Sequence, residues 1–164
     1  MKLDPLDRRI LAELQRDGRL SHVDLAARIG LTATPCARRV RELEEAGVIR
    51  GYTALVEPRK LDLAIQAVVQ VKLERHTDEI VERFRRAMQQ RPEVLTCLAT
   101  TGDMDFLLQV LVRDVDALSD FTLRVLLRLP GVRDVRSSVV LETIKRSTVV
   151  PVEAAPAQAL APNT

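Results

Sequence analysis

Three arginines, Arg38, Arg39 and Arg41, place guanidinium groups close together in the sequence. At about 100° per residue, Arg38 and Arg41 fall on one side of a helix predicted to run to Glu45, opposite its apolar side chains. A planar guanidinium matches a guanine edge or a phosphate, and a helix fits the major groove of duplex DNA. The pattern therefore predicts a DNA-reading face that comprises Thr32, Thr34, Arg38 and Arg41, with Arg39 beside it to reach the phosphate backbone.

The same arginines alternate with Glu42, Glu44 and Glu45, which is equally typical of a solvent-exposed helix held by ion pairs three or four residues apart. Charge alone leaves both interpretations open. The context favours DNA binding, because this helix is the third of three short helices joined by glycine-containing turns. Their expected caps are Asp4 with Pro5, Ser21, and Thr32 or Thr34, and a short strand or wing is expected over residues 48–54.

The second half of the chain has the alternation typical of strands, and it contains a strand, helix and strand pattern twice. Each predicted helix ends at a proline, Pro92 or Pro130, just before a strand that begins with valine. This repeat predicts a ferredoxin-like βαββαβ domain. Its helices would cover one face of the sheet, and the other face, expected to carry Val68 and Val139, predicts a dimer formed sheet to sheet.

The predicted organisation is α+β, with an N-terminal winged helix-turn-helix followed by the ferredoxin-like domain. The expected boundaries are residues 1–56 for the helix-turn-helix, 57–64 for a linker, 65–150 for the sheet domain and 151–164 for a disordered tail.

Composition excludes several classes of protein. The chain has 164 residues and a net charge of +2, and only one Tyr and three Phe, too few rings for a site that stacks single-stranded bases. Cys36 and Cys97 lack the spacing of a metal site or disulfide framework, which favours a reducing compartment and hence the cytoplasm. No stretch approaches the roughly 20 apolar residues of a membrane span.

The motifs resemble those of the Lrp/AsnC family of bacterial and archaeal transcription regulators. The run from Pro35-Cys36 through Gly51-Tyr52 carries most of this resemblance, and the motifs together cover roughly residues 3–150. The resemblance implies a DNA-binding regulator that reads double-stranded DNA with the helix that contains Arg38 and Arg41. It also implies homodimers that pair through their sheets and assemble further into tetramers or octamers.

A loop between the two middle strands, Thr101-Gly102-Asp103-Met104-Asp105, is similar to the Gly-Asp-x-Asp loop of this family. The resemblance implies that Gly102, Asp103, Met104, Asp105 and Ser137 bind a small effector, usually an amino acid. Judged from the residues alone, a tight turn whose aspartate bonds its own backbone is favoured. Both interpretations remain open at this point.

We expect no catalytic residues, metal site or cofactor. Asp103 and Asp105 supply too few ligands for a divalent cation, and no nucleophile is placed beside His22 or His76. Two alternatives remain: an enzyme of the siroheme decarboxylase type, which resembles this two-domain chain, and an effector-binding assembly module that does not bind DNA.

Overall fold

The computed structural model describes residues 2–152, and the chain forms two compact units. One unit contains the N-terminal residues through Leu55 and again the chain from Lys145, and the other comprises Val56–Ile144. The structure thus places residues 145–152 with the N-terminal helices, whereas the sequence pattern groups residues through 150 with the sheet. In the predicted tail, Val152 is half-buried against those helices, and residues 153–164 lie outside the described residues.

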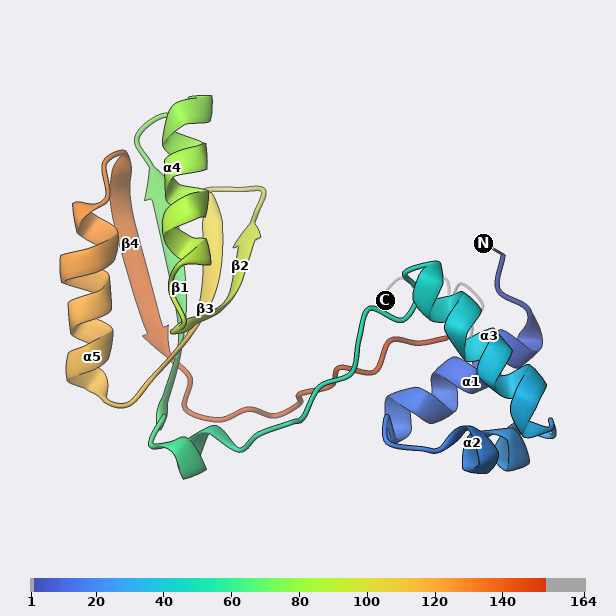
Figure 1. Ribbon diagram of the computed structural model, residues 1–164. Helices are drawn as coiled ribbons and strands as arrows, with labels where there is room; N and C mark the ends of the chain where they lie inside the picture. Colours follow the sequence, from blue (N-terminus) through green and yellow to red (C-terminus); the bar gives the residue numbers. More distant parts are fainter. Residues whose placement is uncertain (1, 153–164) are drawn as a thin grey trace, which may run out of the picture. The chain divides into compact units, whose positions relative to one another are not determined.

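The described residues of the N-terminal unit, called the head below, form three helices: α1 (Pro5–Arg16), α2 (His22–Ile29) and α3 (Ala33–Glu45) (Figure 1). Asp4 caps α1 and, together with Asp7, forms a reciprocal capping box. Gly30 ends α2 in the left-handed conformation, with φ of 77°, which glycine adopts without steric cost. The expected caps Asp4 and Ser21 are confirmed.

A single apolar core holds the three helices together. Its buried members are Ile10, Leu11, Leu25, Ala26, Ile29, Cys36, Val40 and Leu43. Of the strand or wing expected over residues 48–54, the structure shows no strand, since the backbone between α3 and β1 forms no ladder. Among residues 2–152 this segment has no neighbouring strand with which to form a ladder, so its backbone is not paired.

The second unit, called the sheet domain below, begins after a 3-10 turn at Pro58–Leu61. It contains strands β1 (Ile65–Leu73), β2 (Val94–Ala99), β3 (Phe106–Val112) and β4 (Val132–Val139), with α4 (Asp78–Gln89) and α5 (Val115–Asp120) as the crossing helices. The strands are antiparallel in the order β2-β3-β1-β4 (Figure 1). This is the predicted ferredoxin-like βαββαβ arrangement. The α5 helix continues through a π-helical turn at Phe121–Val125 and a 3-10 turn at Leu126–Arg128.

Both helices pack on the same face of the sheet (Figure 1). The core between them contains Val69, Val71, Phe84, Leu108 and Leu126, and the Phe84 and Phe106 rings lie 4.4 Å apart between centroids. None of the helices in residues 2–152 combines the length and apolar character needed to cross a bilayer.

In the part of the chain that the structure describes, no helix packs against the opposite face of the sheet, called the open face below. Val68 lies on this face and pairs with Gln109 and Ser138. The strand register places Leu98, Leu107 and Leu111 on the same face. The expectation that Val139 shares this face is wrong. Val139 pairs directly with Ala67, a fully buried residue of the helix face, and paired residues point to the same side of a sheet.

Candidate nucleic-acid interface and effector loop

The α3 helix has one buried face and one exposed face, as its pattern predicts. Cys36 and Leu43 are fully buried and Val40 is 4% exposed, whereas Thr34 and Arg41 are exposed and the Arg38 side chain is 65% exposed. The apolar face packs into the head core. The arginines on the other face are therefore displayed at the surface of the head.

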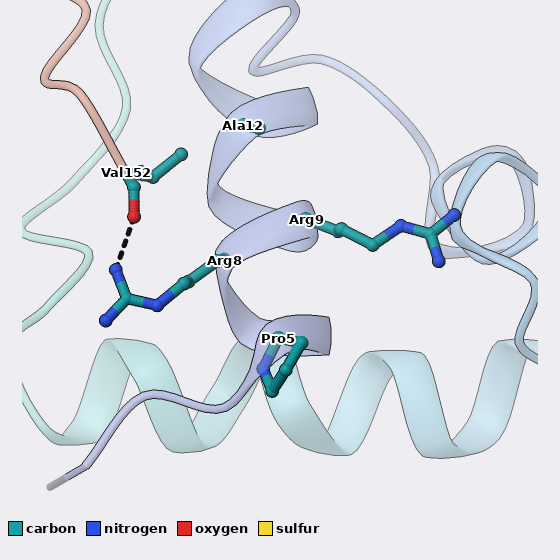
Figure 2. Close-up of a pocket in the computed structure, with 5 residues that line it drawn as sticks. All are labelled: Pro5, Arg8, Arg9, Ala12 and Val152. Atoms are coloured by element: carbon teal, nitrogen blue, oxygen red, sulfur yellow. Dashed lines mark hydrogen bonds between the residues drawn. The ribbon is translucent and has the colours of Figure 1, made fainter. Parts of the chain in front are cut away.

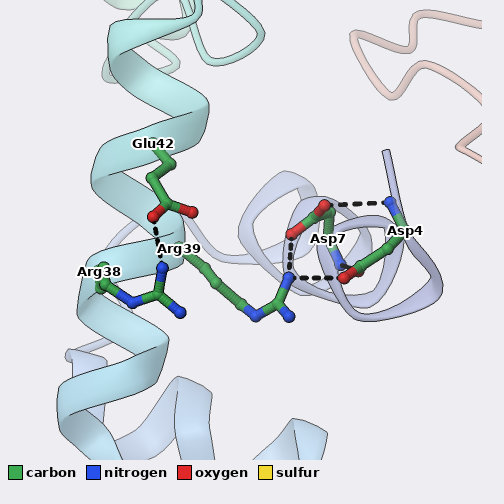
Figure 3. A network of polar contacts seen from close by, with 5 residues as sticks. All are labelled: Asp4, Asp7, Arg38, Arg39 and Glu42. Atoms are coloured by element: carbon green, nitrogen blue, oxygen red, sulfur yellow. Dashed lines mark hydrogen bonds and ion pairs between the residues drawn. The ribbon is translucent and has the colours of Figure 1, made fainter. Parts of the chain in front are cut away.

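Arg38 and Arg41 differ in their partners within the chain. Arg38 Nη1 donates to Glu42 Oε1 at 2.6 Å, one turn along the same helix (Figure 3). Arg41 has no hydrogen bond or ion pair with any residue in the described part of the chain. The solvent-exposed ion-pair interpretation thus holds for Arg38, and Arg41 is the arginine whose donors are free.

In contrast to both, Arg39 contacts α1 and its N-cap residue. Its Nη1 donates to Asp4 Oδ2 at 2.7 Å and to Asp7 Oδ1 at 2.8 Å, and its side chain is only 23% exposed (Figure 3). The backbone N–H of Asp7, and then Arg39, lower the pKa of the Asp4 carboxyl despite an opposing effect of burial. The two carboxylates of the α1 capping box therefore hold this guanidinium against the head. The sequence shows the Asp4-x-x-Asp7 spacing but not the fact that Arg39 lies across from it.

The start of α3 leaves polar groups exposed. Of the two expected caps, Thr32 occupies the N-cap position, but its hydroxyl makes no capping hydrogen bond. The fourth helical residue, Cys36, donates its N–H to the Thr32 carbonyl. Earlier N–H groups of the first turn have no partner inside the helix, and such groups favour a bound anion.

Tyr52, which follows α3, is a residue whose role the sequence did not indicate. Its hydroxyl donates to Glu44 Oε1 at 3.0 Å. Burial of the ring and the Glu44 carboxylate raise the pKa of Tyr52 to about 12. The bond ties the first extended residues after α3 back to the helix and occupies one of its glutamates.

In the loop between β2 and β3, Asp105 uses its polar groups within the protein. Its Oδ2 accepts from the Leu73 N–H at 2.7 Å, where the β1–β4 register shifts, and its Oδ1 lies 2.7 Å from His76 Nε2. Burial raises the pKa of Asp105, but the Leu73 N–H and His76 outweigh it and leave the pKa below its ordinary value. Asp105 therefore has a structural role, but its carboxylate ties the loop to the end of β1 and to His76 and does not bond the backbone of its own turn.

The rest of this loop divides into buried and exposed parts. The Met104 side chain is 8% exposed, and its carbonyl accepts from Thr100 Oγ1 at 2.8 Å. Gly102 and Asp103 are exposed, and φ of Gly102 is 117°, which favours glycine. Asp103 forms no hydrogen bond or ion pair with another described residue, so Gly102 and Asp103 are the groups that a ligand can reach.

Ser137 does not join this loop within one sheet domain. It lies on β4 and pairs with Val69, and its Oγ is 3.2 Å from Thr122 Oγ1. The β1 strand separates β4 from β3, which places the Ser137 strand roughly 10 Å from the strand that follows the loop.

Residues 2–152 contain no cluster of three or more His, Cys, Asp or Glu side chains that could hold a metal ion. Burial raises the pKa of the Cys36 and Cys97 thiols, which keeps both protonated at neutral pH.

Two family models match the chain and coincide with its two folded parts. Residues 3–50 match the winged helix-turn-helix DNA-binding model, and residues 66–150 match the Lrp/AsnC ligand-binding domain. Together with the fold, these matches define the class: a DNA-binding transcriptional regulator with a ligand-binding domain.

Similar proteins identify the family. The leucine-responsive regulatory proteins of Escherichia coli and Salmonella typhimurium are 46% identical over 145 residues, which is 88% of this chain and 88% of each relative. A crystal structure of a Neisseria meningitidis transcriptional regulator in complex with L-Met superposes with a TM-score of 0.88 at 42% identity, and covers 92% of this chain and 97% of that one. An AsnC family regulator from Agrobacterium tumefaciens has a TM-score of 0.86 at 39% identity, with the same coverage. The chain belongs to the Lrp/AsnC family.

Proposed function

We propose that this chain regulates transcription in the cytoplasm by inserting α3 into the major groove of specific DNA sites, under the control of an amino acid bound by the sheet domain. It carries out no catalytic step. The observation that carries the proposal is the exposed Arg38 and Arg41 face, positioned by a fully buried apolar face on the same helix.

Arg41 and Arg38 have different roles in this proposal. Arg41 reads a base edge or a phosphate directly, because its donors are free. Arg38 first exchanges Glu42 for DNA, which costs little because an exposed i,i+4 pair contributes only about 0.3–0.5 kcal/mol. Thr32 and Thr34, at the start of α3, contact the phosphate backbone of the DNA. Arg39 belongs to the structure of the head and is left out of this set, since Asp4 and Asp7 hold it.

The exposed Gly102–Asp103 pair is the proposed effector site. Exposed backbone N–H groups suit the carboxylate of an amino acid, and the Asp103 carboxylate suits its ammonium group. The L-Met bound to the Neisseria regulator and the names of the leucine-responsive relatives support an amino acid of this apolar kind. Ser137 contributes to the effector site of a different sheet domain in a larger assembly, because the Gly102–Asp103 loop of its own chain is two strands away from β4. Met104 and Asp105 hold the loop in shape.

We also propose that the open face forms the dimer. Val68, Leu107 and Leu111 give it an apolar centre on the two middle strands. Two sheets that pack face to face bury such side chains against each other. Dimers then assemble further into tetramers or octamers, and each pair of heads reads two half-sites related by twofold symmetry.

The test begins with selection of duplex DNA from random oligonucleotides by the unmodified chain. On the selected site, Arg41→Ala and Arg38→Ala should each weaken binding by about 1–3 kcal/mol if the residue reads a base, and should relax the preference at one position. A phosphate contact would instead weaken all sequences similarly and lower the salt slope by about 1.

The matched control for this test is Arg83→Ala, which removes an exposed arginine paired with Glu79 on α4 of the sheet domain. It should leave affinity nearly unchanged. Equal affinities for the unmodified chain, Arg38→Ala and Arg41→Ala would remove α3 as the reading helix. A thermal-shift screen of the twenty amino acids, repeated with Asp103→Asn, tests the effector site: a shift that persists in that variant would place the ligand elsewhere.

A further inference from the structure

The segment that follows the sheet domain returns to the head and docks on α1. We call residues 145–152 the strap. Gln15 and Val150 exchange two hydrogen bonds: the Val150 N–H donates to Gln15 Oε1 at 2.6 Å, and Gln15 Nε2 donates to the Val150 carbonyl at 3.0 Å. Two residues further along, the Arg8 guanidinium donates to the Val152 carbonyl (Figure 2).

Apolar packing accompanies these bonds. The Val152 side chain is half-buried against the head core, and it lines a groove on α1 with Pro5, Arg8, Arg9 and Ala12 (Figure 2). The strap is thus held at Val150 and Val152 by three hydrogen bonds and one apolar side chain. All three bonds use backbone groups of the strap, so they recognise its extended conformation.

The α1 helix also holds α3, the proposed DNA-reading helix, which is called the reading helix below. Arg8, which bonds the strap, directly follows Asp7, which accepts a hydrogen bond from Arg39 of α3 (Figures 2 and 3). The strap and α3 therefore bond to consecutive residues of α1, Arg8 and Asp7.

The covalent connections give these contacts a consequence. The chain leaves the head after Leu55 and enters it again at Lys145, so the head is joined to the sheet domain at two places. The second connection follows directly from β4, the strand that carries Ser137. A head held by two connections has less freedom to move than a head on one flexible linker.

We propose that the face of α1 formed by Arg8, Ala12 and Gln15 is a docking surface for the strap of the same chain, and that docking restrains the head for paired binding to DNA. This proposal rests on the function proposed above, in which two heads of one dimer bind two half-sites. A restrained head loses less conformational freedom when both heads bind, and therefore gives tighter binding to a two-half-site duplex.

The docking itself is tested by amide hydrogen exchange on the full chain. Gln15→Leu keeps the size of the side chain and removes both bonds to Val150, so the Val150 amide should exchange at least tenfold faster. The control Arg16→Ala removes only an exposed i,i+3 partner of Glu13 and should leave the Val150 amide unchanged. Unchanged exchange in Gln15→Leu would overturn the docking. The docking would also be overturned if dilution to concentrations at which the dimer dissociates removed the protection of the Val150 amide, since the strap would then come from a second copy.

The restraint is tested with DNA selected by the unmodified chain. We expect Gln15→Leu, and a chain truncated after Ser147, to weaken binding to a two-half-site duplex at least fivefold. Binding to a duplex with one half-site scrambled should change less than twofold. Equal effects on both duplexes, or no effect, would overturn the restraint. An unmodified chain that selects no DNA would overturn the function proposed above, while the exchange measurement would still decide the docking.

Discussion

Arg39 Nη1 lies 2.8 Å from Asp7 Oδ1, and the Asp7 side chain is only 5% exposed, which makes Asp7 the single buried charged residue among those described. The pair joins the middle of α3 to the first turn of α1. A guanidinium at this position of the helix therefore stabilises the head, although its sequence neighbours Arg38 and Arg41 face the solvent.

Arg39→Ala should lower the free energy of unfolding of the head by about 1–3 kcal/mol, because Asp7 would lose its charged donor while remaining buried. Chemical denaturation monitored by exchange of α1 and α2 amides measures this change. The exposed pair Arg16–Glu13 supplies the control, and Arg16→Ala should cost less than about 0.5 kcal/mol. If Arg39→Ala lowered the free energy of unfolding no more than this control, water would be replacing the hydrogen bond that Asp7 loses.

Glu42→Gln should increase affinity for the selected DNA about two- to fivefold. The change replaces the ion pair of Arg38 at 2.6 Å by at most a neutral hydrogen bond, and it removes a negative charge from the helix proposed to enter the groove. Fluorescence anisotropy at several salt concentrations measures the effect. Glu45→Gln removes the same charge from a glutamate without an ion-pair partner among the described residues, and it should have the smaller effect. Weaker binding by Glu42→Gln would mean that Glu42 positions Arg38 for contact.

Asp105 should make the sheet domain sensitive to acid. Its folded-state pKa lies below the ordinary value of 3.8, so its stabilising contribution is fully present above that value and is lost as pH falls through the folded-state pKa. Thermal unfolding between pH 6 and pH 2 should thus show a steeper loss of stability than in Asp105→Asn, which cannot ionise. Parallel curves for the two proteins would contradict this contribution.

Val68→Glu should convert the proposed dimer to a monomer, because it places a charge at the centre of the open face. Val139→Glu introduces the same group into the neighbouring edge strand, but on the helix side of the sheet at a position that is 43% exposed. It should leave the dimer intact. Sedimentation velocity distinguishes the two results. A monomer in the second variant, or a dimer in the first, would place the interface elsewhere.

Much of the fold follows from short-range pattern. The spacing of Cys36, Val40 and Leu43 predicts both the buried face of α3 and the opposite exposure of Arg41, since a helix repeats every 3.6 residues. Alternation over residues 65–73 likewise predicts β1 with its observed bounds.

Pattern fails where a residue's role depends on what lies across from it. Helical spacing places Arg39 at the side of the reading face, but only the packing of α1 against α3 brings Asp4 and Asp7 to its guanidinium. Strand register, which assigns Val139 to the face opposite Val68, likewise depends on pairing with a distant strand.

Local chemistry was therefore enough to predict a helical part and a sheet part, the amphipathic helix α3 and the polar loop at Gly102–Asp103, because caps and periodicities act between residues a few positions apart. Long-range packing decided which arginine is free, which aspartate of the loop is already bonded, and that the strap returns to α1. The strap binds through its own backbone carbonyls and N–H groups, which every sequence has, so no residue pattern marks where it docks.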